Sequence, residues 1–139
     1  MLILCTGNSA RSQMAEGLLR RLGGGQYEVS SAGTRPVGVN PLAIEAMREL
    51  GIDISAQRSK SISEFAGARF AMVITVCDNA AEHCPIFPGA PERLHWSLRD
   101  PAAVSGTPAE KLAAFRKVRD DLEGRVRELV NSAAREAHP

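Results

Sequence analysis

Residues 1–12 read MLILCTGNSARS, an apolar run that ends at Cys5 and then turns polar. Leu2–Leu4 predict a short strand buried in a sheet, and the polar residues after Cys5 predict a loop at the carboxyl end of that strand. Ser12 is a residue type that caps helices, and apolar side chains recur at helical spacing after it. The chain is therefore expected to begin as a strand, a polar loop and a helix.

The predicted loop has the chemistry of an anion-binding site. A loop between a strand and a helix start presents successive backbone N–H groups, and the helix dipole adds partial positive charge there. Arg11 can aim its planar set of donors at the same oxyanion. This field favours thiolate over thiol, so Cys5 is a candidate nucleophile, and Ser12 can donate a hydrogen bond to its sulfur. The alternative is a structural cysteine buried on a strand. The expected oxyanion-binding residues are Thr6, Gly7, Asn8, Ser9, Ala10 and Arg11.

Length and composition exclude several classes of protein. The 139 residues predict a single domain spanning 1–139. With 17 basic and 16 acidic side chains, the chain shows no electrostatic footprint for nucleic acid or a membrane surface. No apolar stretch approaches the ~18 residues that indicate a membrane span, and no leader precedes the first strand, so we expect a cytoplasmic protein. No exposed apolar stripe stands out, and a monomer is expected.

Strands and helices are expected to alternate along the chain. Asn40 should cap the second helix, and a β-branched run predicts the third strand. Such alternation predicts an α/β fold, with a four-stranded parallel sheet flanked by helices on both faces. The predicted helices cover 12–22, 41–50 and 108 to about 132, and the later strands cover 27–32, 70–76 and 92–96.

Asp100 and Cys77 should lie at the same edge of this sheet as Cys5. Ligands of open parallel sheets bind beyond the carboxyl ends of the strands, where all three residues are expected. The carboxyl group of Asp100 can protonate a leaving oxygen, and Pro101 stiffens the loop that carries it. An ordinary Asp-Pro turn is the alternative.

Cys77 and Cys84 form a spaced pair that does not have the four closely spaced ligands of a zinc site. A cytosolic compartment keeps thiols reduced unless a disulfide is transient and catalytic. The spacing therefore suggests a thiol relay, in which Cys5 forms a covalent intermediate, Cys77 attacks it, and Cys84 then forms a disulfide with Cys77 by thiol exchange. Two loop cysteines without a redox role are the alternative.

Five segments of the sequence together resemble one known family. The chain is similar, from Met1 to about Val130, to the thioredoxin-coupled arsenate reductases, which are built on the low-molecular-weight protein tyrosine phosphatase fold. The loop alone would indicate only a phosphatase-like protein, whereas the two later cysteine segments point to arsenate. The segments are Cys5–Ser12, Ser31–Thr34, Cys77–Ala81, Cys84–Gly89 and Asp100–Pro101.

The resemblance implies a role for each matching residue. Cys5 would attack arsenate held by the loop amides and Arg11, while Asp100 supplies a proton to the departing water. Cys77 would then attack Cys5 and release arsenite. Cys84 would resolve the Cys5–Cys77 disulfide, leaving Cys77–Cys84 for reduction by thioredoxin. No metal or organic cofactor is implied.

One departure from the family concerns a monovalent cation. Some relatives bind potassium near the loop through residues that match Asn8, Glu16 and Ser31, with an acidic residue after the second helix. This chain has Lys60 in that neighbourhood, and its positive charge would repel the ion. We therefore expect no potassium site.

Two other functions remain open at the level of sequence. A low-molecular-weight tyrosine phosphatase would use Cys5, Arg11 and Asp100, with the other cysteines incidental. A non-enzymatic thiol sensor would report through Cys77 and form its disulfide with peroxide alone. The scarcity of aromatic residues, 4% of the chain, offers little to stack on a phosphotyrosine ring.

Overall fold

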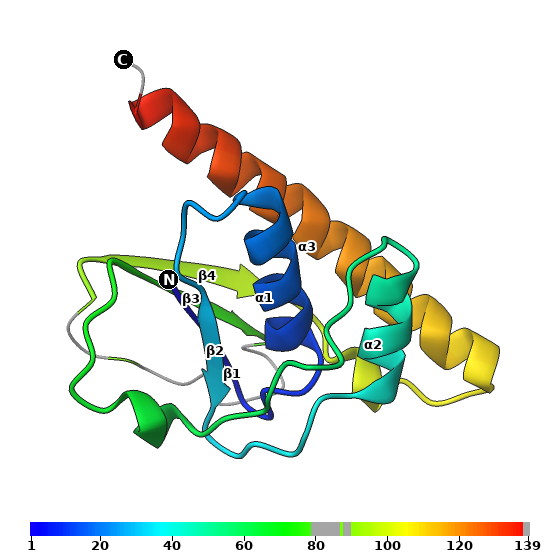
Figure 1. Ribbon diagram of the computed structural model, residues 1–139. Coiled ribbons are helices and arrows are strands. Elements are labelled where there is room, and N and C mark those ends of the chain that lie inside the picture. Colours follow the sequence, from blue (N-terminus) through cyan, green and yellow to red (C-terminus); the bar gives the residue numbers. More distant parts are fainter. Residues whose placement is uncertain (79–86, 88–89, 138–139) are drawn as a thin grey trace.

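The computed structural model describes residues 1–78, 87 and 90–137. Among these residues the strands form one four-stranded parallel sheet in the order β2-β1-β3-β4 (Figure 1). The strands are β1 (Leu2–Cys5), β2 (Ser30–Gly33), β3 (Met72–Cys77) and β4 (Glu92–Ser97). The helices are α1 (Arg11–Leu22), α2 (Pro41–Arg48) and α3 (Pro108–Ala137), with the short 3₁₀ helices η1 (Ile62–Phe65) and η2 (Pro101–Ala103).

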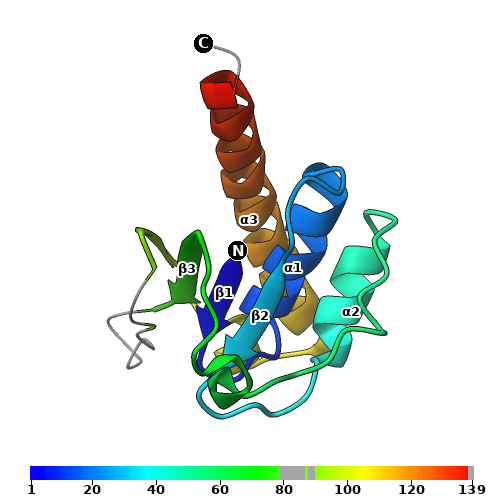
Figure 2. The same ribbon diagram turned by 60° about the vertical axis from the view of Figure 1, so that its left-hand side comes forward.

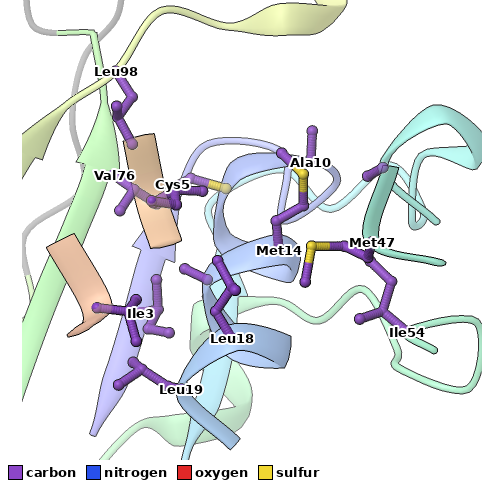
Figure 3. Close-up of a cluster of buried hydrophobic side chains, with 14 of the residues drawn as sticks. Ile3, Cys5, Ala10, Met14, Leu18, Leu19, Met47, Ile54, Val76 and Leu98 are labelled. Carbon is purple, nitrogen blue, oxygen red and sulfur yellow. The ribbon is translucent and has the colours of Figure 1, made fainter. Parts of the chain in front are cut away.

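The sheet has two covered faces. Helices α1, α2 and α3 pack on one face, and their apolar residues form the larger core with Ile3, Ile74 and Val76 (Figures 2 and 3). On the other face, apolar residues of η1 pack against a smaller cluster that includes Leu2 and Leu4. The fold class predicted from the sequence is confirmed. Among the described residues, the helix that packs on the second face is the short 3₁₀ helix η1.

The predicted element boundaries shift by a few residues. Helix α1 begins at Arg11 with Ala10 as its N-cap and no side-chain cap, so the prediction that Ser12 caps this helix is wrong. Asn40 does cap α2, because its side chain accepts a 2.8 Å hydrogen bond from the Leu42 amide. Strand β2 begins at residue 30 and not 27, since the register pairs Leu2 with Ser30.

A cluster of charged side chains ties α2 to α3. Arg119, only 8% exposed, donates from Nη1 to the Ala46 carbonyl at 2.9 Å and to Glu49 Oε1 at 2.7 Å. Arg116 donates from Nη2 to Glu49 Oε2 at 2.6 Å. The hydrogen bonds from these two arginines lower the pKa of Glu49 to about 2. The end of α2 is therefore fixed against α3 by a carboxylate that stays ionised at neutral pH.

No helix in the described part of the chain joins the length and the apolarity that crossing a membrane requires.

Candidate active site

The loop between β1 and α1 is held open by its surroundings. The carbonyl oxygens of Thr6, Gly7 and Ser9 accept hydrogen bonds of 2.9, 3.1 and 3.0 Å from backbone amides in segment 35–40. In a trans peptide the C=O and the following N–H point in opposite directions. The amides that follow these three carbonyls therefore point into the loop. Several inward N–H groups make a cup for a tetrahedral anion.

Cys5 lies at the base of this cup. Its side chain is a free thiol in a residue only 2% exposed, and its Sγ lies 2.8 Å from Ser12 Oγ and 3.1 Å from the Asn8 amide. The Asn8 side chain donates from Nδ2 to Ser12 Oγ at 2.9 Å. Because that amide group can only donate, the hydroxyl hydrogen of Ser12 is left for the sulfur. Both contacts stabilise a thiolate, and the predicted Ser12–Cys5 contact is confirmed.

The first turn of α1 completes the positive side of the cup. It carries no acidic residue, so no carboxylate of that turn offsets the partial positive charge at the helix start. Arg11 is 5% exposed and donates from Nη1 to the Leu98 carbonyl at 3.0 Å. This bond fastens the anion-binding loop to the segment that follows β4. The segment includes Asp100, two residues after Leu98.

Asp100 sits at the rim of an open groove of about 880 Å³. Its Oδ1 accepts a 2.9 Å hydrogen bond from the Ala102 amide and caps η2. Asp78, Arg99 and Lys117 line the same groove. The structure therefore brings Cys5, Ser12 and Arg11 together at the loop, and Arg11 links the loop to Leu98, two residues before Asp100.

Asn8 connects the nucleophile to a buried carboxylate. Its Nδ2 donates to Ser31 Oγ at 2.9 Å, and Ser31 Oγ donates to Glu16 Oε1 at 2.6 Å. The ammonium of Lys60 lies 3.8 Å from the same Glu16 oxygen. Burial lowers the pKa of Lys60, and the Glu16 carboxylate partly offsets that effect. In the part of the chain described, no group of three or more His, Cys, Asp or Glu side chains is placed to hold a metal ion.

Gly33 is a site residue to which the sequence analysis gave no role. It pairs with Cys5 in the sheet, and a Cβ there would meet the Thr6 carbonyl, and would lie 2.9 Å from the Asn8 amide. Only glycine lets the end of β2 approach the loop this closely. The sequence gives a weak signal, a glycine that ends a strand, but the register with Cys5 comes from the tertiary structure.

Cys77 is buried at the end of β3 and is disulfide-bonded. Ile74 and Val76 share the larger core with Cys5. Figure 3 shows Val76 beside Cys5. Side chains alternate between the faces of a strand. Cys77 therefore points to the opposite face of the sheet from Cys5. Cys84 lies outside the described residues.

A parallel sheet with a cysteine at the base of an amide cup, next to an arginine at a helix start, defines a cysteine-dependent, oxyanion-binding enzyme fold. The family model described as low molecular weight phosphotyrosine protein phosphatase matches residues 1–138. The chain belongs to this family.

Similar proteins carry a more specific name. The arsenate reductase of Halalkalibacterium halodurans is 48% identical over 124 residues, 89% of each chain. A solved arsenate reductase in the phosphate-binding state is 35% identical, with a TM-score of 0.79 over 94% of this chain and 95% of its own. A thioredoxin-dependent arsenate reductase from Corynebacterium glutamicum is 30% identical, with a TM-score of 0.71 over 94% of this chain and 59% of its own. The resemblance found in the sequence is confirmed.

Proposed function

We propose that this protein reduces arsenate to arsenite, with Cys5 as the nucleophile. The observation that carries the proposal is the free Cys5 thiol, held by Ser12 Oγ and the Asn8 amide at the base of the anion cup. A thiolate in this position can attack the arsenic of a bound arsenate. The inward amides and Arg11 neutralise the charge on its remaining oxygens.

The first step needs a proton for the departing oxygen. When the Cys5 sulfur bonds to arsenic, one hydroxyl group leaves, and a proton from Asp100 turns it into water. Asp100 borders the groove next to the segment that Arg11 holds, which supports this role. The product of the step is a covalent adduct in which arsenic is still pentavalent.

The second step is the reduction. The Cys77 thiolate attacks the Cys5 sulfur, and the electron pair of the sulfur–arsenic bond stays with arsenic, which leaves as trivalent arsenite. Two thiols lose two electrons and arsenic gains them. Cys84 then attacks Cys77 and frees Cys5. Since Cys77 and Cys5 point to opposite faces of the sheet, the end of β3 must rearrange during this step.

Two observations favour a small inorganic substrate and a reductive outcome. Among the described residues, the exposed large apolar side chains are Val37, Leu94 and Val104, none of them aromatic. Val37, which is 75% exposed, borders the loop, because its backbone N–H donates a hydrogen bond to the Gly7 carbonyl. The relatives from Halalkalibacterium halodurans and Bacillus subtilis, which are 48% and 45% identical to this chain, are named arsenate reductase.

The proposal extends to the partner and the compartment. Thioredoxin is the proposed reductant of the Cys77–Cys84 disulfide, which one structural neighbour supports by its name. We place the protein in the cytoplasm as a single-domain monomer that uses no metal or organic cofactor. Thioredoxin and glutathione keep that compartment reducing.

The test is a reconstituted reduction of arsenate. Reduced protein, arsenate, thioredoxin, thioredoxin reductase and NADPH are combined, arsenite is measured, and the disulfide is mapped by mass spectrometry. Repeated turnover in the wild type and its loss in Cys77→Ser and Cys84→Ser are expected. Turnover of an aryl phosphate that survives both substitutions, without any arsenite, would instead assign the site to a phosphatase.

A further inference from the structure

Asn8 adopts an uncommon backbone conformation. Its φ of 45° lies in the left-handed region, and among the described residues every other positive φ belongs to glycine. Asn tolerates this region better than most residues with a side chain, so the surrounding hydrogen bonds decide whether Asn8 keeps it. Asn8 is also fully buried, so those hydrogen bonds come from the protein.

The surroundings that fix Asn8 include a buried glutamine from α1. Gln13 donates from Nε2 to the Asn8 carbonyl at 3.1 Å and to Asn8 Oδ1 at 3.0 Å, so one amide group holds both the backbone and the side chain of Asn8. The same nitrogen lies 3.1 Å from the Arg58 carbonyl. Three oxygens therefore face this nitrogen, and the Gln13 amide cannot turn over without placing its own oxygen against them.

A second glutamine fixes the first. Gln57 donates from Nε2 to Gln13 Oε1 at 2.8 Å and to the Gln13 carbonyl at 3.0 Å. Gln57 lies 44 residues after Gln13, in the segment that follows α2. Gln57 therefore holds the side chain of Gln13 in place, and Gln13 in turn holds Asn8.

The orientation of Asn8 decides how the nucleophile is held. The Asn8 amide donates to Cys5 Sγ, and Asn8 Nδ2 donates to the Ser12 hydroxyl that contacts the same sulfur. Both hydrogen bonds to Cys5 thus depend on Asn8. A change in its φ would also turn one of the inward amides out of the anion cup.

We propose that the Gln13–Gln57 pair is a positioning device that holds Asn8 in its left-handed conformation and so sets the anion affinity of the loop and the reactivity of Cys5. Neither glutamine touches the substrate. The proposal deepens the function proposed above, because it concerns the same loop, but it requires only that the loop binds an oxyanion and activates a thiol.

The experiment uses substitutions that remove the donors while keeping length and charge. Gln57→Met is the main variant, because Gln57 is only partly buried, and Gln13→Met is the second. Gln26→Met, at an exposed position outside the site, is the matched control. The groups whose charges act on the loop, Arg11, Glu16 and Lys60, are left in place.

Two measurements do not depend on reductase turnover. One is the dissociation constant for inorganic phosphate, by calorimetry. The other is the alkylation of Cys5 by iodoacetamide over a range of pH, in a Cys77→Ser/Cys84→Ser background. A misplaced Asn8 weakens its hydrogen bond to the Cys5 thiolate, and one such bond to a charged group is worth about tenfold. We therefore expect phosphate affinity and the alkylation rate at neutral pH to fall by up to about tenfold in both glutamine variants.

The outcomes separate the possible explanations. Weaker phosphate binding and slower alkylation in Gln57→Met, with the control unchanged, support the positioning role, whether or not the wild type reduces arsenate. A lower melting temperature with wild-type phosphate affinity and an unchanged alkylation profile overturns it and leaves the pair a purely structural contact. A wild type that binds phosphate but makes no arsenite overturns the reductase proposal alone.

Discussion

Replacing Ser12 by alanine removes one defined contact from the nucleophile. In the structure Ser12 Oγ lies 2.8 Å from Cys5 Sγ, in a fully buried position at the start of α1. Alanine keeps the helix, because it has the highest helix propensity and Ser12 is not the cap. The substitution therefore changes the environment of the sulfur and leaves the fold in place.

The size of the effect follows from the charge on the thiolate. A hydrogen bond to a charged group contributes about 1.5–3 kcal/mol. Since about 1.4 kcal/mol is a tenfold change, the thiolate population of Cys5 should fall about ten- to a hundredfold. The Asn8 amide still contacts Cys5 Sγ at 3.1 Å, so the reactivity of the thiol is reduced and not abolished.

The assay is the rate of Cys5 alkylation by iodoacetamide in a Cys77→Ser/Cys84→Ser background, measured where the rate still rises with pH. There the rate is proportional to the thiolate population. Ser105→Ala, at an exposed position, is the control for the loss of a hydroxyl group. Equal rates in the wild type and in Ser12→Ala, at equal melting temperatures, would refute the claim that Ser12 holds the thiolate.

Three further predictions concern the loop, the ion pairs between α2 and α3, and the cation environment. Gly33→Ala should weaken phosphate binding by more than tenfold, because its methyl group would meet the loop backbone, and calorimetry measures this. Glu49→Gln should make the free energy of unfolding depend less on pH in acid. The Glu49 pKa is about 2, against 4.5 for the free side chain, so its contribution to stability is present above pH 4.5 and is lost as the pH falls towards 2. Urea unfolding across that range tests it. Potassium should not change the activity of the wild type at constant ionic strength, because the Lys60 ammonium already lies 3.8 Å from Glu16. Steady-state rates in potassium and in sodium salts compare the two.

Two of these predictions have a control variant in the chain. Gly124→Ala adds a methyl group where the described surroundings leave open space, so phosphate binding should not change. Glu128→Gln removes an exposed carboxylate on α3 and should leave the acid profile as it is. An activity that rises with potassium and not with sodium would contradict the expectation of no potassium site.

Much of the fold could be predicted from short-range patterns. The apolar run before Cys5, the Asn40 cap and the helical spacing after residue 108 depend on neighbours within a few residues, and each is observed. Boundaries were less accurate where tertiary pairing decides them. The start of β2 is set by its register with β1, and the start of α1 by the geometry of the loop.

The candidate site could be predicted in part for the same reason. Cys5, Ser12 and Arg11 lie within one loop and the helix that follows it, so their proximity follows from the local fold. Lys60 reaches the loop, and Gln57 reaches Gln13 on α1, from a segment more than forty residues away. No local pattern predicts the contact of Gln57. Their contacts depend on how the segment after α2 crosses the sheet edge.

The sequence by itself determined the order of the elements and the chemistry of the opening loop, because backbone hydrogen bonding and the spacing of residues 1–12 are local properties. Only the tertiary structure decided that Ser12 does not cap α1, that Gly33 makes room for the loop, and that Cys77 points away from Cys5. The physical reason is that register, the face of a strand and buried hydrogen-bond networks are set by which distant segments pack together.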